Sequence, residues 1–143
     1  MVIPDVNVLV YAFRGELAAH EPVRRWLAAR SAGAAPLGLS ELVASGFVRV
    51  VTHPRVFRRP TTVDAALDFV EALAAQPATT RVRPGPRHWA IFLSLCRAVG
   101  ARGNLVPDAY LAAQAVELGA EWISTDRDFA RFPGLRWSSP LDT

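Results

Sequence analysis

The sequence predicts an α/β protein with a central, mainly parallel sheet that helices cover on both faces. Short apolar segments are typical of strands, and longer segments with apolar residues three and four apart are typical of helices. The two kinds alternate along the chain, as parallel strands joined by helices do. With 143 residues, 51% hydrophobic and 20% charged, the chain is expected to form one domain over residues 1–143 with its own core.

The spacing of apolar residues places the first elements. Val23, Trp26 and Leu27 recur at helical intervals, so we expect a helix around them. Ser40 ends an apolar strand and can cap the next helix, because a serine side chain accepts a free N–H at a helix start. The expected elements are a strand over 1–5, a segment over 6–13 that fits a helix or a strand, a helix over 20–30, a strand over 35–40 and a helix over 41–51.

A basic loop bounded by proline is expected over residues 52–60. The segment after it, 61–76, opens with threonine and an early aspartate, which suit a helix start. Its apolar residues have helical spacing, so we expect one face of this helix to consist of Val63, Leu67, Val70 and Leu73.

Glycine and proline mark the remaining elements. Gly100 and Gly119 suit the residue that follows a helix, and Pro107 suits a first helical turn. The expected elements are a short strand over 81–85, a helix over 86–100, a loop over 101–106, a helix over 107–119, a strand over 121–125, a short helix over 126–132 and a strand over 135–137.

The composition favours a polyanionic partner and a cytoplasmic location. All sixteen basic residues are arginine, the formal net charge is +3 and the pI is about 10.0. Arginine binds phosphate through paired N–H groups, which suits nucleic acid, although coding bias explains the missing lysines equally well. Cys96 is the single cysteine, no apolar run could span a membrane, and the N-terminus lacks a basic secretory start, so we expect a cytoplasmic protein without disulfides.

Acidic residues recur at predicted strand ends and helix starts. Asp5 follows the first apolar strand, Glu41 the second and Asp126 the third clear one. Asp108 begins a helix, and Asp128 lies two residues beyond Asp126. Ligands of open α/β sheets bind beyond the carboxyl ends of the strands, so these acids could meet at one edge.

Taken singly, most of these acids have a simpler interpretation. An acid in a first helical turn complements the helix dipole, which accounts for Glu41, Asp108 or Asp128. Asp5 fits this interpretation less well, because it interrupts an apolar stretch. Taken together, carboxylates in one pocket repel one another unless a cation compensates, and Mg²⁺ or Mn²⁺ prefers such oxygen ligands. A bound ion would activate water and neutralise a phosphodiester, which is nuclease chemistry.

Three segments carry a family resemblance: IPDVNVLVYA at the start, SELVASGFVRVVTHPRVF in the middle, and NLVPDAYLAAQAVELGAEWISTDRDFARFPGLRW towards the end. In this order and spacing the chain resembles the PIN-domain ribonucleases, particularly the VapC toxins of type II toxin–antitoxin pairs. The resemblance implies a PIN-like fold in a single domain. It also implies a Mg²⁺- or Mn²⁺-dependent endoribonuclease that lowers translation until a VapB-like antitoxin neutralises it.

The resemblance also implies the catalytic residues, which are four acids. Asp5 and Asp108 would be the main metal ligands, and Asp126 would complete the set directly or through water. Glu41 would bind metal-coordinated water and assist its deprotonation. These four residues are therefore expected to lie together.

Neighbouring polar residues are expected to support the ligands. Asn7, Ser40 and Thr125 lie one or two residues from the acids, and Asp128 matches an additional acid often found beside the fourth. A local helix cap is an alternative role for Asn7, and a bond to backbone is an alternative for Thr125. Pro4 departs from the aliphatic residue common at this position and is expected to put its strand locally near a sheet edge.

The basic loop is expected to contact RNA. Arg55, Arg58 and Arg59 can bind phosphate, while His53 and Phe57 lie among them and aromatic rings stack on unpaired bases. The alternative is a solvated loop that packs Phe57 against the core.

The expected partners are an RNA substrate, a cognate VapB-like antitoxin and a second copy of the chain, for which the Ala-rich helix over 61–76 offers a face. Two other functions are alternatives. A haloacid-dehalogenase-like phosphatase also has an acid after its first strand, but it needs a second aspartate where this chain has Asn7, and a lysine, which the chain lacks. A non-catalytic RNA-binding PIN module would retain the fold without the chemistry.

Overall fold

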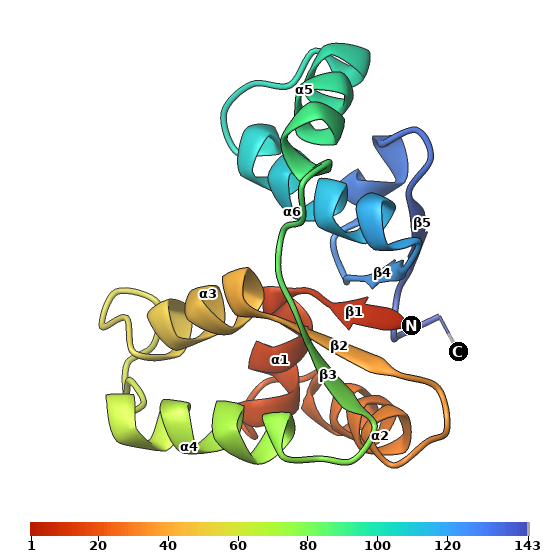
Figure 1. Cartoon of the computed structure of the whole chain (residues 1–143). Helices are drawn as coiled ribbons and strands as arrows, with labels where there is room; N and C mark the ends of the chain where they lie inside the picture. Colours follow the sequence, from red (N-terminus) through yellow and green to blue (C-terminus); the bar gives the residue numbers. More distant parts are fainter. Residues whose placement is uncertain (143) are drawn as a thin grey trace.

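The computed structural model describes residues 1–142, and the strands in this range form one five-stranded sheet (Figure 1). Every neighbouring pair of strands is parallel, which confirms the predicted fold class. The strand order is β3-β2-β1-β4-β5, where the strands are β1 (Val2–Pro4), β2 (Leu37–Ser40), β3 (Thr79–Val82), β4 (Glu121–Ile123) and β5 (Arg136–Ser138).

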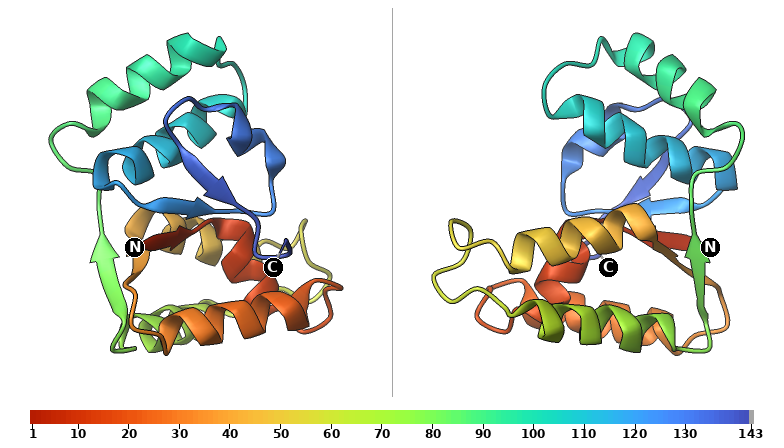
Figure 2. Two further views of the ribbon diagram at one scale, coloured as in Figure 1. Left: turned by 90° about the vertical axis from the view of Figure 1, so that its right-hand side faces the viewer. Right: turned by 60° about the vertical axis from the view of Figure 1, so that its left-hand side comes forward.

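Helices cover both faces of the sheet. Figure 2 shows α5 and α6 on one side and α2 and α4 on the other. Right-handed crossovers produce this arrangement when the chain reverses its direction along a parallel sheet. None of the helices within residues 1–142 is long and apolar enough to cross a bilayer. The helices are α1 (Val6–Phe13), α2 (His20–Ser31), α3 (Glu41–Val51), α4 (Val63–Ala74), α5 (His88–Val99), α6 (Leu105–Leu118) and the short 3₁₀ helix η1 (Arg127–Arg131).

The core lies on both faces of the three middle strands. Ile3 of β1, Leu37 of β2 and Trp122 of β4 are fully buried, and Leu9 of α1 and Phe47 of α3 pack in the same cluster. Full burial of one such side chain contributes about 1.5–3 kcal/mol to folding. The strands are therefore apolar on both sides because helices cover both sides.

The strand order opens a crevice between β1 and β4. The chain passes from β1 to β2 and β3 on one side, and then crosses to β4 and β5 on the other. At such a switch point the segments leaving two adjacent strands diverge, which leaves room for a ligand. The register pairs Pro4 with Ile123, and the Asp5 N–H donates to the Ile123 carbonyl at 2.8 Å. Asp5 and Ser124 therefore follow their strands at the same edge.

Pro4 lies in the central strand of the sheet, so the expectation of a local sheet edge is wrong. The Val2 N–H donates to the Pro36 carbonyl before β2, whereas the Asp5 N–H points to β4. Because N–H groups alternate along a strand, the N–H that Pro4 lacks belongs to the β2 side. The β1–β2 register accordingly contains the single pair Val2 and Leu37, and β1 keeps three pairs with β4.

The predicted helix caps are present. The segment that fitted a helix or a strand is helix α1, and Ser40 caps α3 by accepting the Val43 N–H at 3.4 Å. Gly100 and Gly119 follow α5 and α6 with φ of 59° and 62°. Helix α6 starts two residues earlier than expected, which leaves Pro107 in the first turn, where an N–H has no partner within the helix.

The predicted apolar face of α4 is wrong in part. Val63 and Leu67 are 55% and 42% exposed, whereas Ala66 and Leu73 are buried. Ala66 has a small side chain and stands out little in an apolar pattern, although it lies on the face that α4 turns to the core. The exposed valine and leucine leave that helix with an apolar outer surface.

Candidate active site

Asp5 directly follows β1 and is 5% exposed. Its Oδ1 accepts the Val6 N–H at 2.7 Å, and its Oδ2 accepts the Ser124 hydroxyl at 2.7 Å and the Asn7 amide at 3.1 Å. Burial raises the pKa of Asp5 and the charge of Asp126 raises it further, while the three hydrogen bonds lower it. The fold thus holds the Asp5 carboxyl group where its ionised form is unfavourable unless a positively charged group or ion lies close to it.

Asn7 and Ser124 join the end of β1 to the end of β4. The Asn7 side chain donates from Nδ2 to Ser124 Oγ at 3.0 Å and accepts the Thr125 N–H at 3.1 Å. Ser124 Oγ also accepts the Asp126 N–H at 3.1 Å. Because the buried Ser124 donates its proton to Asp5, its hydroxyl makes one donor and two acceptor contacts, its full capacity.

Asp126 is the third residue after β4 and caps η1. Its Oδ1 accepts the Asp128 N–H at 2.9 Å, so the carboxylate is held at the start of the short helix. Asp128 is exposed, and its negative charge raises the pKa of Asp108. Asp128 therefore influences the site through its charge and its backbone.

Asp108 enters the site from the first turn of α6. Desolvation raises its pKa to about 6, and the charges of Asp126, Asp5 and Asp128 contribute in that order. Asp5, Asp108 and Asp126 line one cavity of about 490 Å³ together with Asn7. Three segments far apart in the sequence thus bring carboxylates to one place at the switch point.

The donor set of this cavity fits a hard divalent cation. Asp5, Asp108 and Asp126 offer carboxylate oxygens, whose mutual repulsion a cation would relieve. Within residues 1–142, no group of three or more His, Cys, Asp or Glu side chains lies in an arrangement that could hold a metal ion. Mg²⁺ commonly retains several waters and takes one or two carboxylates, so such a cavity suits it or Mn²⁺ better than it suits a closed structural zinc site.

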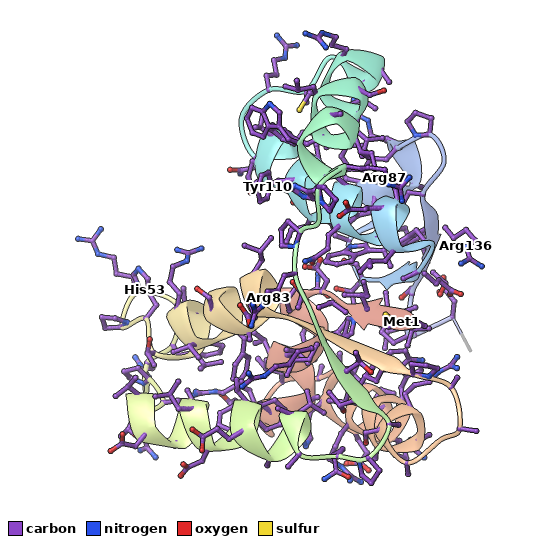
Figure 3. All side chains as sticks on the ribbon, viewed as in Figure 1. Met1, His53, Arg83, Arg87, Tyr110 and Arg136 are labelled. Atoms are coloured by element: carbon purple, nitrogen blue, oxygen red, sulfur yellow. The ribbon has the colours of Figure 1, made fainter. Side chains whose placement is uncertain are left out.

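Glu41 lies apart from the three aspartates. It is exposed, its Oε2 accepts Arg83 Nε at 3.0 Å, and it lines a different cavity of about 200 Å³. Figure 3 shows Arg83 beside α3, on the segment that leaves β3. Further along this segment, the Glu117 carboxylate accepts the N–H groups of Gly85 and Arg87 at 2.7 and 2.8 Å. The segment between β3 and α5, which includes Arg83, is therefore held against α6.

The side chains expected to support the ligands have different positions. The Asn7 side chain contacts Asp5. Thr125 donates its backbone N–H to Asn7, and Asp128 donates its backbone N–H to Asp126. Ser40 caps α3. Ser124, which the sequence analysis did not single out, supplies the hydroxyl at the centre of the network. Its signal in the sequence is a small polar residue after an apolar strand, two positions before Asp126. That signal becomes specific only when β4 is known to lie beside β1.

The basic loop, residues 52–60, borders the acidic cavity. Val56 and Phe57 line both this cavity and a neighbouring one of about 530 Å³. Arg14 fixes the loop by donating from Nη1 to the Arg59 carbonyl at 2.9 Å, with its guanidinium 4.0 Å from the centre of the Phe57 ring. Figure 3 labels His53 near the start of this loop, beyond the end of α3. The exposed arginines of the loop are Arg55, Arg58 and Arg59.

Comparison with known proteins gives full-length matches. The PIN domain model matches residues 2–135. Ribonuclease VapC43 of Mycobacterium tuberculosis is 51% identical over 142 residues, which cover 99% of this chain and 97% of that protein. Ribonuclease VapC25 of the same organism is 42% identical over 140 residues, which cover 98% of this chain and 99% of that protein.

Solved structures share the fold at low sequence identity. VapBC2 from Rickettsia felis, bound to a DNA fragment from its promoter, has a TM-score of 0.73 at 14% identity and covers 97% of this chain and 98% of its own. VapC20 of M. tuberculosis, described as a toxin that cleaves the sarcin–ricin loop, has a TM-score of 0.67 at 17% identity, with coverages of 95% and 99%.

The protein is therefore an α/β protein with a parallel sheet and an acidic site at the switch point of that sheet. Such a site suits phosphate chemistry. The chain belongs to the PIN-domain family and, within it, to the VapC ribonucleases.

Proposed function

We propose that this protein is the toxin of a VapBC-type pair and a Mg²⁺- or Mn²⁺-dependent endoribonuclease that lowers translation by cutting RNA. The observation that carries the proposal is the convergence of Asp5, Asp108 and Asp126 on one cavity at the switch point of the sheet. The 51% identity to a named VapC ribonuclease supports the same reaction. The cleaved bond is a phosphodiester of the RNA backbone.

The three aspartates would hold the cation. Asp5 is oriented by the hydroxyl of Ser124 and the amide of Asn7, and Asp126 by its position at the start of η1. Asp108 completes the set from α6, and its raised pKa means that protons compete with the cation for this carboxylate at mildly acidic pH. When bound, the ion supplies positive charge against the phosphodiester and lowers the pKa of a water molecule.

Glu41 is the proposed acceptor of the proton from the attacking water, at one of its carboxylate oxygens. To act there it must leave Arg83, with which it forms an ion pair on the surface. An exposed pair of this kind contributes about 0–1 kcal/mol, so exchange of partners costs little. Arg83 would then be free to face the RNA backbone.

The basic loop is the proposed contact for the phosphates beside the cleaved bond. Arg55, Arg58 and Arg59 are exposed, and their loop borders the acidic cavity. Their positive charges would attract RNA and offset the negative charge of the aspartates.

The proposed partners are a VapB-like antitoxin and a second copy of the chain, in the cytoplasm where its RNA substrate is found. The neighbour from R. felis is a complex named VapBC2, which supports an antitoxin partner for this chain. Val63 and Leu67 give α4 an exposed apolar surface, and this supports a contact between two copies.

The phosphatase alternative is disfavoured by the contacts of Asn7. The Asn7 amide holds Asp5 and the backbone after β4, where an acid/base aspartate would be needed, and the chain has no lysine. A non-catalytic RNA-binding module would have no need for three carboxylates in one cavity. The nuclease therefore remains the function that the site supports best.

A cleavage assay on single-stranded RNA tests the proposed function. We expect cleavage with Mg²⁺ or Mn²⁺, none with EDTA, and a loss of more than about 100-fold for Asp5→Asn, since residues that merely support metal ligands already cost 10–100-fold. Asp64→Asn, at an exposed first-turn acid of α4, is the matched control and should cleave like the wild type. Metal-independent cleavage, or full activity of Asp5→Asn, would contradict the mechanism, and phosphate release from small monoesters would favour the phosphatase.

A further inference from the structure

The acidic cavity is lined by two chemically different sets of side chains. One set is the carboxylates of Asp5, Asp108 and Asp126, and most of the remaining lining is apolar. Helix α1 contributes Val6, Val10 and Tyr11 to this lining, and the end of α3 contributes Val50. The apolar wall, defined here as the cavity residues other than the aspartates and Asn7, consists of Val6, Val10, Tyr11, Leu17, Val50, Val56 and Phe57.

The outer part of the wall is exposed and held in place. Val56 is 55% exposed although it is a large apolar residue. The Val56 and Phe57 N–H groups both donate to the His53 carbonyl at 3.1 Å, which forms a tight turn. Arg14 anchors the far side of the loop at Arg59. A preformed apolar surface inside a cavity is characteristic of a ligand site.

The Phe57 ring is shared between two cavities. Arg14 lines only the neighbouring cavity, where its guanidinium lies 4.0 Å from the centre of the ring. Phe57 also lines the acidic cavity, and Arg14 does not, so the aromatic side chain borders that cavity together with Val56. Aromatic side chains are groups on which bases of unpaired RNA stack.

The occupant of the wall must be compatible with the charges around it. The three aspartates, with their cation, are the proposed place of a phosphodiester, so an occupant of the apolar wall of the same cavity, about 490 Å³ in volume, lies close to that phosphodiester. Arg55, Arg58 and Arg59 project from the loop that forms the wall, and they attract a polyanion and repel a basic peptide.

We propose that the apolar wall is a subsite for one unpaired nucleobase, that of a nucleotide adjoining the phosphodiester that is cut. This inference rests on the proposed ribonuclease function and adds to it the part of the substrate that the enzyme recognises. Only an unstacked base can enter the cavity, so the subsite selects loops and single strands over duplex RNA.

RNA with a single missing base tests the subsite. The cleaved bond is first mapped in a short single-stranded RNA, and abasic nucleotides are then placed separately on either side of that bond. For the wild type we expect one of the two abasic RNAs to be cut about 10-fold more slowly than the intact RNA, within the range known for base–aromatic stacking. For Val56→Ser and for Phe57→Leu, the ratio of the cleavage rate of intact RNA to that of the abasic RNA should be smaller, at most about 3-fold.

The matched control is Leu118→Ser at the end of α6. Leu118 is a large apolar residue that is 43% exposed and lies outside the lining of this cavity, so its serine variant should keep the wild-type ratio. The inference is overturned if both abasic RNAs are cut as fast as intact RNA. It is also overturned if the Val56 and Phe57 variants keep the full difference in rate between intact and abasic RNA. That second result would assign the wall to an apolar side chain of a partner protein. Absence of any metal-dependent cleavage by the wild type would instead refute the proposed function.

Discussion

The hydroxyl of Ser124 connects the two strands that form the candidate site. It donates to Asp5 and accepts from Asn7 and from the backbone of Asp126, so one buried atom orients two of the three aspartates. Among the hydrogen bonds that lower the pKa of Asp5, that of Ser124 is the largest contributor. Loss of this hydroxyl would leave Asp5 with a higher pKa and a less defined orientation.

Ser124→Ala should therefore reduce RNA cleavage by about 10–100-fold, the range seen when a side chain that orients a metal ligand is removed. It should also lower the free energy of unfolding by about 1–3 kcal/mol, because the buried Asp5 carboxylate loses a donor, and the Asn7 amide and the Asp126 N–H each lose one acceptor. Cleavage rates and thermal unfolding of the purified variant measure the two effects.

Thr125→Val is the matched control for this prediction. Thr125 contributes its backbone N–H to Asn7, and valine retains that group and the shape of the side chain. We expect activity close to wild type. An equal loss in both variants would mean that the strand end as a whole, rather than the Ser124 hydroxyl, supports the site.

At the residue scale, the sequence was informative where a carboxylate interrupts or follows an apolar strand. Asp5 and Asp126 were selected because each follows an apolar strand, and Asp108 because it begins a helix; all three line the cavity. The sequence could not reveal that Glu41 pairs with Arg83, 42 positions away, because the contact depends on β3 lying beside β2. Long-range side-chain contacts of this kind require the register of the sheet.

At the scale of elements, helix ends were predictable because glycine, proline and capping residues act locally. The strand expected over 81–85 lies instead at Thr79–Val82, where it pairs with β2 from Leu37 to Ser40. Its two threonines favour an extended conformation but are polar, so an apolar pattern overlooks them. Strand limits depend on the neighbouring strand, and the sequence does not give that neighbour directly.

The loop over residues 52–60 depends on one side chain of another element. Arg14, at the end of α1, donates to the Arg59 carbonyl and to Thr61 Oγ1 at 2.9 and 3.0 Å, and its side chain is only 12% exposed. Such a partly buried guanidinium binds several acceptors at once, which a shorter amide cannot do. The position of Val56 and Phe57 beside the cavity follows from this anchor.

Arg14→Gln should loosen the loop without unfolding the domain. Limited digestion with trypsin should then cut after Arg55 and Arg58 several-fold faster, because proteolysis follows local opening. Arg24→Gln, which removes an exposed pair with Glu21 on α2, is the control and should be cut at the wild-type rate. Equal rates for both variants would show that other contacts hold the loop.

At the scale of the molecule, the fold gathers negative charge where parallel strands change direction. Alternation of strands and helices predicted the parallel sheet and a site at the carboxyl ends of its strands. The strand order β3-β2-β1-β4-β5 makes β1 central, and this order was not predictable from single segments. Pro4 illustrates the difficulty, since a proline argues for an edge and the topology overrides it. The three aspartates gathered there, Asp5, Asp108 and Asp126, are the proposed divalent cation site.

The proposed cation site affects the stability of the protein. The pKa of Asp108 is raised to about 6 from a usual value of 3.8, so folding favours its protonated form. The stability that Asp108 contributes to the metal-free protein is therefore present below about pH 4, decreases as the pH rises through 6, and is absent about one pH unit above that. Asp108→Asn removes the charge. After allowance for solvent screening, its free energy of unfolding at neutral pH should be about 1 kcal/mol higher than that of the wild type, or roughly 3 °C in melting temperature.

Thermal unfolding of the wild type and Asp108→Asn, each in EDTA and in Mn²⁺, is the sharpest test of the proposed cation site, with Asp64→Asn as control. We predict that in EDTA at pH 7.5 Asp108→Asn melts higher than the wild type, that the difference disappears near pH 4, and that Mn²⁺ stabilises the wild type more than the variant. A variant that melts no higher than the wild type at pH 7.5, and that gains as much from Mn²⁺, would contradict a shared cation site.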